Sequence, residues 1–366
     1  MAVGGTRIAL AALRLIRLAP DGSTGGLEFN GPKTSLPAVN QHYCEGGKPI
    51  EAFPRAAAVS PDGKWLYLTG YTWDEGGSTA GNAQRWIHGV LRVGLDGQGT
   101  TNLFVGTTGW NVPNAGNGPD KLNSPMSVAC DSQGRVYVAD YGNNRVQVFT
   151  PDGKLQESIP ANRPAHVAVH PKTGEIYVFS WAMLCDVLDS KKEAVEAMLT
   201  CLDGSGQHKK TSEYRLPFLN YGSAPSRAYG PTPGMQYRVE MDSWSDAPTL
   251  WVISGGSIKV FVIEKDKLAL KKDFGSVAAK AIGCDVPSSG RQRLSVNPRT
   301  GKVYIMDGMG TAAGDRIVEI DPVKGKDRYV DLPFGAEDIC FDINGLAYLR
   351  TGEMVVRYDP ANWREV

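Results

Sequence analysis

The sequence predicts an all-β fold built from repeated antiparallel sheets, and three observations support this prediction. A short pattern of strand, turn and strand recurs along most of the 366 residues, which is the signature of a repeat architecture. The 43 Gly and 23 Pro residues predict many turns between short elements. Hydrophobic residues make up 42% of the chain, and no linker-like stretch interrupts it, so we expect one domain over residues 1–366.

The clearest copy of the pattern runs from Ser124 to Ile159, with the sequence SPMSVACDSQGRVYVADYGNNRVQVFTPDGKLQESI. Turn signals at SQG, GNN and PDG separate apolar or alternating runs of about five residues each. Runs of this length, joined by short turns, are typical of neighbouring antiparallel strands. The copy therefore predicts a four-stranded antiparallel meander.

This copy resembles an NHL repeat, which has a Pro-x-x-Val-Ala-Val start, an Asp-x-x-Gly turn, a Tyr-Val-Ala-Asp strand and an Asn-Arg-Val strand. Looser copies bring the total to six, and they lie at residues 55–70, 165–180, 237–254, 292–307 and 337–350. A third strand follows each copy, as HGVLRVGLDG, NNRVQVFTPDG, AMLTCLDG, SIKVFVIEKDK, GDRIVEIDP and GEMVVRYDP. The resemblance implies a six-bladed β-propeller with blades starting near residues 55, 125, 165, 237, 292 and 337.

The two ends of the chain bear on how such a ring closes. The last copy stops at Val366 after three predicted strands, and an unpaired edge exposes backbone donors and acceptors. We therefore expect residues near Thr6 to Leu18 to supply the missing outer strand. Residues 1–54 then form a closing strand and an extended N-terminal segment.

Charge and hydropathy limit the partners. Lys and Arg together number 39, as do Asp and Glu, so the whole molecule offers no net attraction to nucleic acid or to an anionic membrane. No run of about 18 uncharged apolar residues predicts a membrane span. The apolar stretch RIALAALRLIRL is interrupted by arginines, which indicates a strand rather than a leader. The Trp- and Gly-rich loops and the resemblance to secreted propellers favour an extracytoplasmic location, and a place in a larger polypeptide stays open.

The six cysteines show no CxxC spacing. Cys130 and Cys340 lie inside apolar strand patterns, where we expect buried free thiols. Cys185 and Cys201 flank an insertion. A disulfide between them is an alternative that sequence spacing leaves open.

Equivalent positions at the starts of the inner strands of a propeller form a ring around one mouth of its channel. Aligning the copies on their turn glycines places six residues in one such tier: Ala56, Ser127, His166, Arg238, Arg293 and Asp338. The preceding tier holds Arg55, Met126, Ala165, Tyr237, Gln292 and Glu337. The NHL pattern implies a small residue in the first tier, whereas four blades here carry a large polar or ionisable one. Burying such groups is costly unless they pair or face a ligand.

Two interpretations of this ring stay open. As a pocket, its guanidinium groups, His and Tyr would bind a carboxylate or sulfate by bidentate hydrogen bonds. The expected ligand-binding residues are Arg55, Gln292, Glu337 and Asp338, with a stacking rim of Trp73, Trp86, Trp110 and Trp181 from the long loops. As a closed network, the groups would satisfy one another, for example Arg293 with Asp338, and the Trp side chains would pack the loops onto the ring.

A catalytic version of the pocket has the parts for β-elimination, the reaction of uronate-polysaccharide lyases. His166 or Tyr237 would act as general base or acid, and Arg238 or Arg293 would stabilise charge building on a carboxylate. The predicted ligand is an anionic saccharide or another small molecule. The alternatives are a non-catalytic ligand- or partner-binding module of a larger protein and, less favoured by the neutral net charge, an RNA-binding NHL domain.

Metal sites can be compared with the families that the repeat resembles. Peptidyl-hydroxyglycine amidating lyases hold zinc with His residues at the starts of inner strands, which implies about three such ligands. Here only His166 is near such a position. His170 lies at the far end of the same strand, and loops are expected to hold His42, His88 and His208. Zinc is therefore not expected. Gluconolactonase-type propellers hold a divalent cation with acidic and Asn ligands; Glu240 and Asp338 are the candidates for calcium, although the Asn positions do not match.

The Asp140, Asn143, Asn144 and Arg145 cluster resembles the ordinary turn of an NHL repeat. Asp140 ends the Tyr-Val-Ala-Asp strand, and Asn144 and Arg145 begin the Asn-Arg-Val strand. The resemblance therefore implies a structural role for this cluster rather than a catalytic one.

Overall fold

The computed structural model describes most of the chain, and every statement below concerns these residues. They are 41–45, 48–54, 56–70, 72–73, 87–95, 101–110, 115–181, 196–216, 238–241, 248–254, 257–264, 267–273, 294–307, 314–321, 323–324, 326–336, 338–342, 344–350 and 354–366. Within them the regular elements are β-strands apart from the 3-10 helix η3 (Tyr141–Asn143). The all-β prediction is confirmed. No helix among these residues has the length and apolar character needed to cross a membrane.

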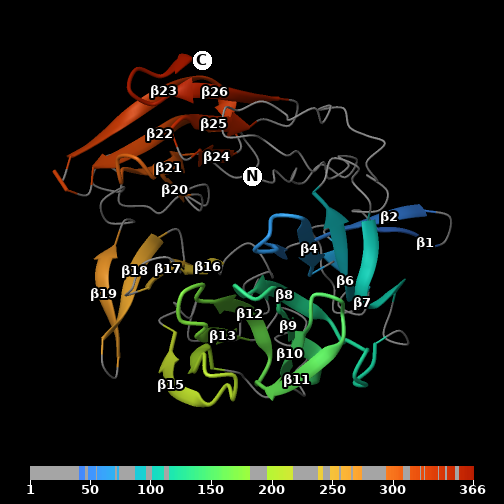
Figure 1. The fold of residues 1–366 in the computed structure, drawn as a ribbon. Coiled ribbons are helices and arrows are strands. Elements are labelled where there is room, and N and C mark those ends of the chain that lie inside the picture. Colours follow the sequence, from blue (N-terminus) through green and yellow to red (C-terminus); the bar gives the residue numbers. More distant parts are fainter. Residues whose placement is uncertain are drawn as a thin grey trace, which may run out of the picture.

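The described strands form six four-stranded antiparallel sheets and one three-stranded sheet. The first three large sheets are β3 (Ala56–Val59), β4 (Trp65–Thr69), β6 (Ile87–Gly94) and β7 (Thr101–Trp110); β8 (Pro125–Cys130), β9 (Val136–Asp140), β10 (Arg145–Phe149) and β11 (Leu155–Pro160); and β12 (Pro164–Val169), β13 (Ile176–Ser180), β14 (Met198–Leu202) and β15 (Lys210–Arg215). The next three are β16 (Arg238–Met241), β17 (Thr249–Ser254), β18 (Ser257–Glu264) and β19 (Lys267–Asp273); β20 (Leu294–Val296), β21 (Val303–Asp307), β22 (Gly314–Asp321) and β23 (Lys326–Ala336); and β24 (Asp338–Phe341), β25 (Ala347–Arg350), β26 (Val355–Asp359) and β27 (Arg364–Glu365). Figure 1 shows these sheets following one another in chain order around a common centre.

Turn chemistry sets the register of each hairpin. In the second sheet, Asp131 accepts the backbone N–H groups of Gln133 and Arg135 at 2.9 and 2.8 Å, and Gly134 takes a positive φ of 81°. An Asp side chain that satisfies the backbone of a tight turn favours this geometry, and glycine adopts the left-handed conformation without strain. The following strand β9 is buried along its whole length. The Asp-x-x-Gly pattern therefore becomes the hairpin that joins β8 to β9.

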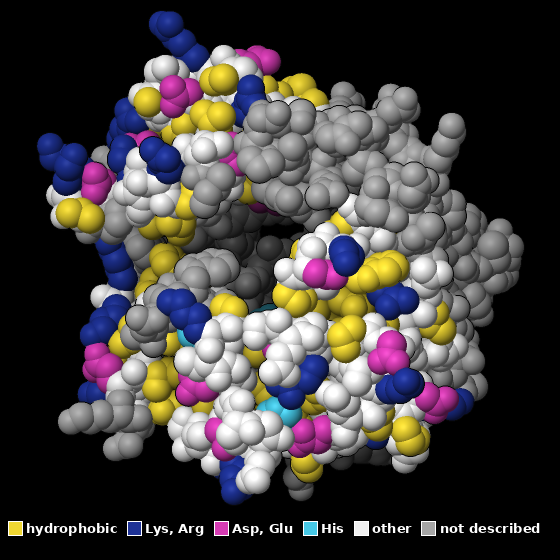
Figure 2. All heavy atoms as spheres, in the orientation of Figure 1, with side chains coloured by type: hydrophobic (Ala, Val, Ile, Leu, Met, Phe, Trp, Pro, Cys, Tyr) yellow, Lys and Arg dark blue, Asp and Glu magenta, His cyan; other side chains and the backbone are white. Residues whose placement is uncertain are grey.

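The hydrophobic core lies between neighbouring sheets. Tyr67 and Val90 of the first sheet pack against Val128 and Val138 of the second in one cluster. A second cluster joins residues of the second and third sheets, among them Tyr137, Val146, Ile159, Val167 and Ile176. The strands β3, β8 and β12 consequently lie side by side, and the molecule is hollowed at its centre (Figure 2).

The last sheet corrects one prediction. It has four strands rather than three, because β27 pairs with β26 through Tyr358 with Glu365 and Asp359 with Arg364. The backbone N–H groups of Asn362 and Trp363 donate to the Asp359 carbonyl, so a tight turn folds the C-terminal residues back. The Trp363 ring packs 5.9 Å from that of Tyr304. The predicted closing strand near residues 6–18 lies outside the described residues.

Strands before the first large sheet pair with a segment that the sequence placed in a loop. The three-stranded sheet consists of β1 (Gln41–Glu45), β2 (Lys48–Phe53) and β5 (Thr72–Trp73). β5 falls within residues 70–88, which exceed the repeat, and it pairs with β2 through Ala52 with Trp73 and Phe53 with Thr72. Part of this long connection is therefore ordered sheet.

Three cysteines are free thiols: Cys130, Cys201 and Cys340. Burial raises the pKa of Cys201 to about 11 and that of Cys130 and Cys340 to about 12. The prediction of free thiols is confirmed for Cys130 and Cys340, although both residues are half-buried rather than fully buried. The alternative disulfide of Cys201 with Cys185, which lies outside the described residues, is not formed.

Candidate ligand site at the starts of the inner strands

The pairing register brings one residue of each of five inner strands to an equivalent position. The partner of each residue is on the second strand of the same sheet. In every case this partner follows an aromatic residue of the second strand by two positions. The pairs are Ala56 with Thr69, Ser127 with Ala139, His166 with Phe179, Arg238 with Ile253, and Asp338 with Arg350. Each of these residues lies at or near the start of its strand, and the sheets follow one another around a common centre (Figure 1).

Ser127 and His166 join the second and third sheets at this level. The Ser127 Oγ lies 3.0 Å from the His166 Nδ1, and the backbone N–H of Val167 donates to the same Oγ at 3.3 Å. Ser127 is 2% exposed, whereas His166 is half-buried. The imidazole ring also contacts the ring of Phe179, with centroids 5.3 Å apart. Two sheets therefore hold one histidine ring.

The environment of His166 changes its proton affinity. Burial lowers the pKa of His166 to about 4, because a charged imidazolium loses solvation there. The ring is therefore neutral at pH 7. Since an effective general base has a pKa near the working pH, His166 in this setting suits hydrogen bonding better than proton abstraction.

A pH-dependent loss of stability follows from this lowered pKa. Between pH 6.5 and about 4 the unfolded chain binds a proton at His166 that the folded chain does not, so stability falls as the pH falls through this window. The contribution is at most about 3 kcal/mol. We expect His166→Gln to lose less stability than the wild type between pH 7 and pH 4, measured by urea unfolding at each pH. Parallel curves for the two proteins would contradict this prediction.

Asp338 lies opposite a buried basic residue. Its Oδ1 accepts the backbone N–H of Ile339 at 3.0 Å, and it is half-buried. Its strand partner, Arg350, is 7% exposed. Residues paired directly across antiparallel strands point to the same face of a sheet. The last sheet therefore carries an acidic and a basic group together at this end.

Trp181 has a packing role. It follows β13 directly and packs, partly buried, against a cluster of Met126, Tyr141 and Ala165. This cluster spans the second and third sheets, beside the Ser127 and His166 pair. The structure places the backbone of Trp73 in β5 and of Trp110 at the end of β7, and it says nothing of their side chains. Trp181 therefore has a packing contact, and its stacking on a ligand stays a prediction.

Several predicted site residues lie outside the described part of the chain. They are Arg55, Trp86, Tyr237, Gln292, Arg293 and Glu337. For Arg238 and Glu240 the backbone is described, in β16, but the side chains are not. Within the described residues no group of three or more His, Cys, Asp or Glu side chains could hold a metal ion. The convergence of the predicted pocket and its calcium candidates therefore stays a prediction.

Three of the remaining histidines, His88, His170 and His208, have structural contacts. His42 and His88 lie in strands β1 and β6, so the prediction that they are in loops is wrong. His88 is 2% exposed, and its Nδ1 accepts the backbone N–H of Ser124 at 2.9 Å. His170 accepts the N–H of Thr173 within its turn, and His208 lies 2.6 Å from the Glu157 carboxylate. Sequence periodicity did not indicate the hydrogen bond of His88, because its partner Ser124 lies at the entrance to the next sheet.

Asp140 fixes the segment that leads into the site. Its buried carboxylate accepts hydrogen bonds from the Asn123 backbone N–H at 2.7 Å and from Asn143 Nδ2 and Arg145 Nε at 2.8 Å. The Arg145 guanidinium also donates to the carbonyls of Asn117, Gly118 and Lys121 at 2.9 to 3.1 Å. Residues 116–123 are thus tied to the second sheet, as expected of a structural turn.

Comparisons with known proteins agree with the repeat pattern. Residues 122–149 match the model of the NHL repeat. The human NHL repeat-containing protein 3 is 56% identical over 43 residues, which are 12% of this chain and 12% of the human protein. The chain thus matches a small part of that relative.

Two solved structures are similar over most of their length. A streptogramin B lyase is 15% identical with a TM-score of 0.47, covering 90% of this chain and 87% of its own. A gluconolactonase of Xanthomonas campestris is 15% identical with a TM-score of 0.43, covering 88% of this chain and 92% of its own. Residues 122–149 of the chain are therefore identified as an NHL repeat.

Proposed function

We propose that the chain is a six-bladed propeller that binds an anionic carbohydrate or a small carboxylate at the mouth formed by the starts of its inner strands. The observation that supports this proposal is the pairing register of the inner strands, which puts His166, Arg238 and Asp338 at equivalent positions of three sheets. A closing strand near residues 6–18 would lie beyond β27, because β27 already pairs with β26.

The residue types at this mouth suit an anionic ligand. Arg238, with Arg293 beside β20, would bind a carboxylate by bidentate hydrogen bonds. The Trp side chains of the long loops would stack on a sugar ring, which buries apolar area at little entropic cost. Calcium held by Glu240 and Asp338 is a further element of this proposal.

The reaction that these groups would support is β-elimination. Tyr237, in its phenolate form, would take the proton from the carbon next to the carboxylate, because the neutral His166 is a weak base. The C–O bond at the next carbon then breaks, the electron pair of the former C–H bond forms the double bond, and the Tyr237 phenol would give its proton to the leaving oxygen. The arginines would stabilise the charge that develops on the carboxylate.

The test combines binding and turnover. The chain is incubated with polygalacturonate, alginate, hyaluronan and lactones, and unsaturated product is followed by ultraviolet absorbance while calorimetry measures binding. Arg238→Ala is expected to weaken binding about 10- to 100-fold, the effect of losing a charge-assisted hydrogen bond. Lys64→Ala is the control, because Lys64 lies in the turn at the other end of β3 with its side chain 74% exposed. Equal binding by wild type and Arg238→Ala would contradict the site.

A second candidate is a non-catalytic recognition module of a larger protein. The observation that favours it is the environment of His166, whose lowered pKa and contact with Ser127 suit binding more than proton transfer. Saturable binding without product in the same assay would support this candidate. Absence of both binding and turnover would contradict a small anionic ligand altogether.

A further inference from the structure

The contacts of the Ser127 hydroxyl determine where its proton goes. Its oxygen accepts the backbone N–H of Val167, and the side chain is almost completely buried. A buried hydroxyl that donates no hydrogen bond is destabilising. Among the described residues, the hydroxyl has one further hydrogen-bonding contact, with the His166 Nδ1 at 3.0 Å, and a deprotonated ring nitrogen is an acceptor. The hydroxyl therefore donates to Nδ1.

An Nδ1 that accepts a hydrogen bond carries no proton, so the proton of a neutral imidazole ring is on Nε2. The opposite tautomer would direct the Nδ1–H at Ser127 and leave the serine hydroxyl without an acceptor. A lost buried hydrogen bond of this kind corresponds to a preference of about 5- to 150-fold for the Nε2–H form. The contact with Phe179 restrains the plane of the ring.

We infer that Ser127 is a positioning residue that holds His166 in its Nε2–H tautomer, so that the ring presents a hydrogen-bond donor to a ligand at the channel mouth. The ligand class that this donor recognises is an oxygen acceptor, such as a carboxylate or a sugar oxygen. The ligand part of the inference deepens the proposed function and rests on it, whereas the tautomer assignment stands on the Ser127 contacts alone.

The test is nitrogen-15 NMR of the imidazole groups in the whole chain at pH 7, because the two ring nitrogens have different shifts in the two tautomers. His88 and His170 accept backbone N–H groups at Nδ1 and serve as internal Nε2–H references. The His208 Nδ1 faces the Glu157 carboxylate, which can only accept, and so serves as an internal reference for a protonated Nδ1. The signal absent from His166→Gln identifies His166.

We expect His166 to show the Nε2–H pattern in the wild type and a mixture of tautomers in Ser127→Ala. Ser127→Thr keeps the hydroxyl and is expected to restore the pattern. Thr69→Val is the matched control: it removes a buried hydroxyl of the first sheet that donates to the Gly89 carbonyl, so it should leave the His166 signal unchanged.

An Nδ1–H pattern in the wild type would overturn the inference, as would an unchanged tautomer in a folded Ser127→Ala. If Ser127→Ala does not fold, the wild-type and Ser127→Thr spectra still decide the assignment. Titration with oligogalacturonate should shift the His166 Nε2–H signal, and a titration without any shift would overturn the donor role. An Nε2–H pattern together with no binding of any saccharide would remove the proposed function while leaving the tautomer assignment intact.

Discussion

Asp140→Ala is expected to lower the free energy of unfolding by about 3–5 kcal/mol, the usual effect of removing one partner of a buried ion pair. The Asp140 side chain is completely buried, and the Arg145 side chain that donates to it is 16% exposed. Without the carboxylate, the Arg145 guanidinium keeps its charge in a largely buried position. The backbone N–H of Asn123 also loses its acceptor. The loss therefore combines an uncompensated charge with an unsatisfied donor.

Urea unfolding, followed by tryptophan fluorescence, measures this change. Asp152→Ala is the matched control, because Asp152 pairs with Lys154 on an exposed turn, where ion pairs contribute little. Burial raises the pKa of Asp140 in spite of its three donors, so its charge is itself costly. Asp140→Asn should consequently lose less stability than Asp140→Ala. A loss in Asp140→Ala no larger than in Asp152→Ala would show that the cluster does not hold the segment.

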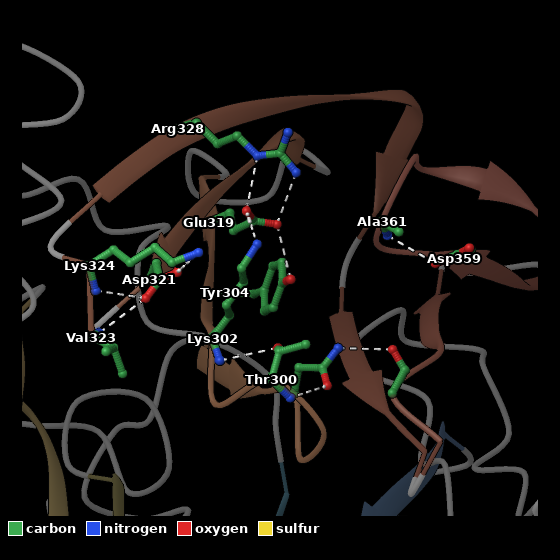
Figure 3. Close-up of polar contacts among 12 residues, drawn as sticks. Thr300, Lys302, Tyr304, Glu319, Asp321, Val323, Lys324, Arg328, Asp359 and Ala361 are labelled. Atoms are coloured by element: carbon green, nitrogen blue, oxygen red, sulfur yellow. Dashed lines mark hydrogen bonds and ion pairs between the residues drawn. The ribbon is translucent and has the colours of Figure 1, made fainter.

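Glu319→Ala is expected to lower the free energy of unfolding by about 2–3 kcal/mol, in line with lost hydrogen bonds to a charged group. Figure 3 shows three side chains converging on this carboxylate. Lys302 Nζ lies at 2.8 Å, Tyr304 Oη at 3.0 Å, and Arg328 Nε and a terminal guanidinium nitrogen at 3.0 and 3.2 Å. The Glu319 side chain is 6% exposed, but those of Lys302 and Arg328 are 30% and 53% exposed. Water can thus solvate the remaining charges.

The effect of Glu319→Ala should depend on pH. Burial raises the pKa of Glu319, but hydrogen bonds from Arg328, Lys302 and Tyr304 outweigh it and hold the pKa below the usual 4.5. A lowered pKa contributes stability above pH 4.5, and this contribution is lost as the pH falls through the folded value. The difference between wild type and variant should therefore shrink in acid.

Thermal unfolding at neutral and acidic pH tests both statements about Glu319. Tyr304→Phe removes one of the hydrogen bonds with little change in volume and should lose about 1 kcal/mol. Glu264→Ala is the surface control, since its partner Lys271 lies on an exposed hairpin and the pair is open to water. A Glu319→Ala difference that stays constant with pH would contradict the assigned ionisation.

Local features of the chain were enough to predict the sheets. Turn signals of the Asp-x-x-Gly kind, followed by apolar runs, placed the second and third strands of each copy, including β10, β18 and β26. This works because a hairpin is stabilised by residues close in sequence: a polar side chain satisfies the turn, and a glycine allows its backbone conformation. The free thiols of Cys130 and Cys340 followed from the same strand patterns.

Local sequence patterns could not predict the contacts between sheets. The hydrogen bond from Ser124 to His88, the pairing of β2 with β5 and the folding back of β27 join segments that no local pattern relates. The lowered pKa of His166 also depends on surroundings that a neighbouring sheet supplies. Each of these features is decided by desolvation and by the distance between chain segments far apart in sequence.

By itself, the sequence determined an all-β repeat and the turns that join its strands, and it predicted a row of polar residues at the starts of the inner strands. Only the tertiary structure decided which of those residues touch. It placed Ser127 of one sheet against His166 of the next. It also left the imidazole neutral, because burial lowers the pKa of His166 to about 4.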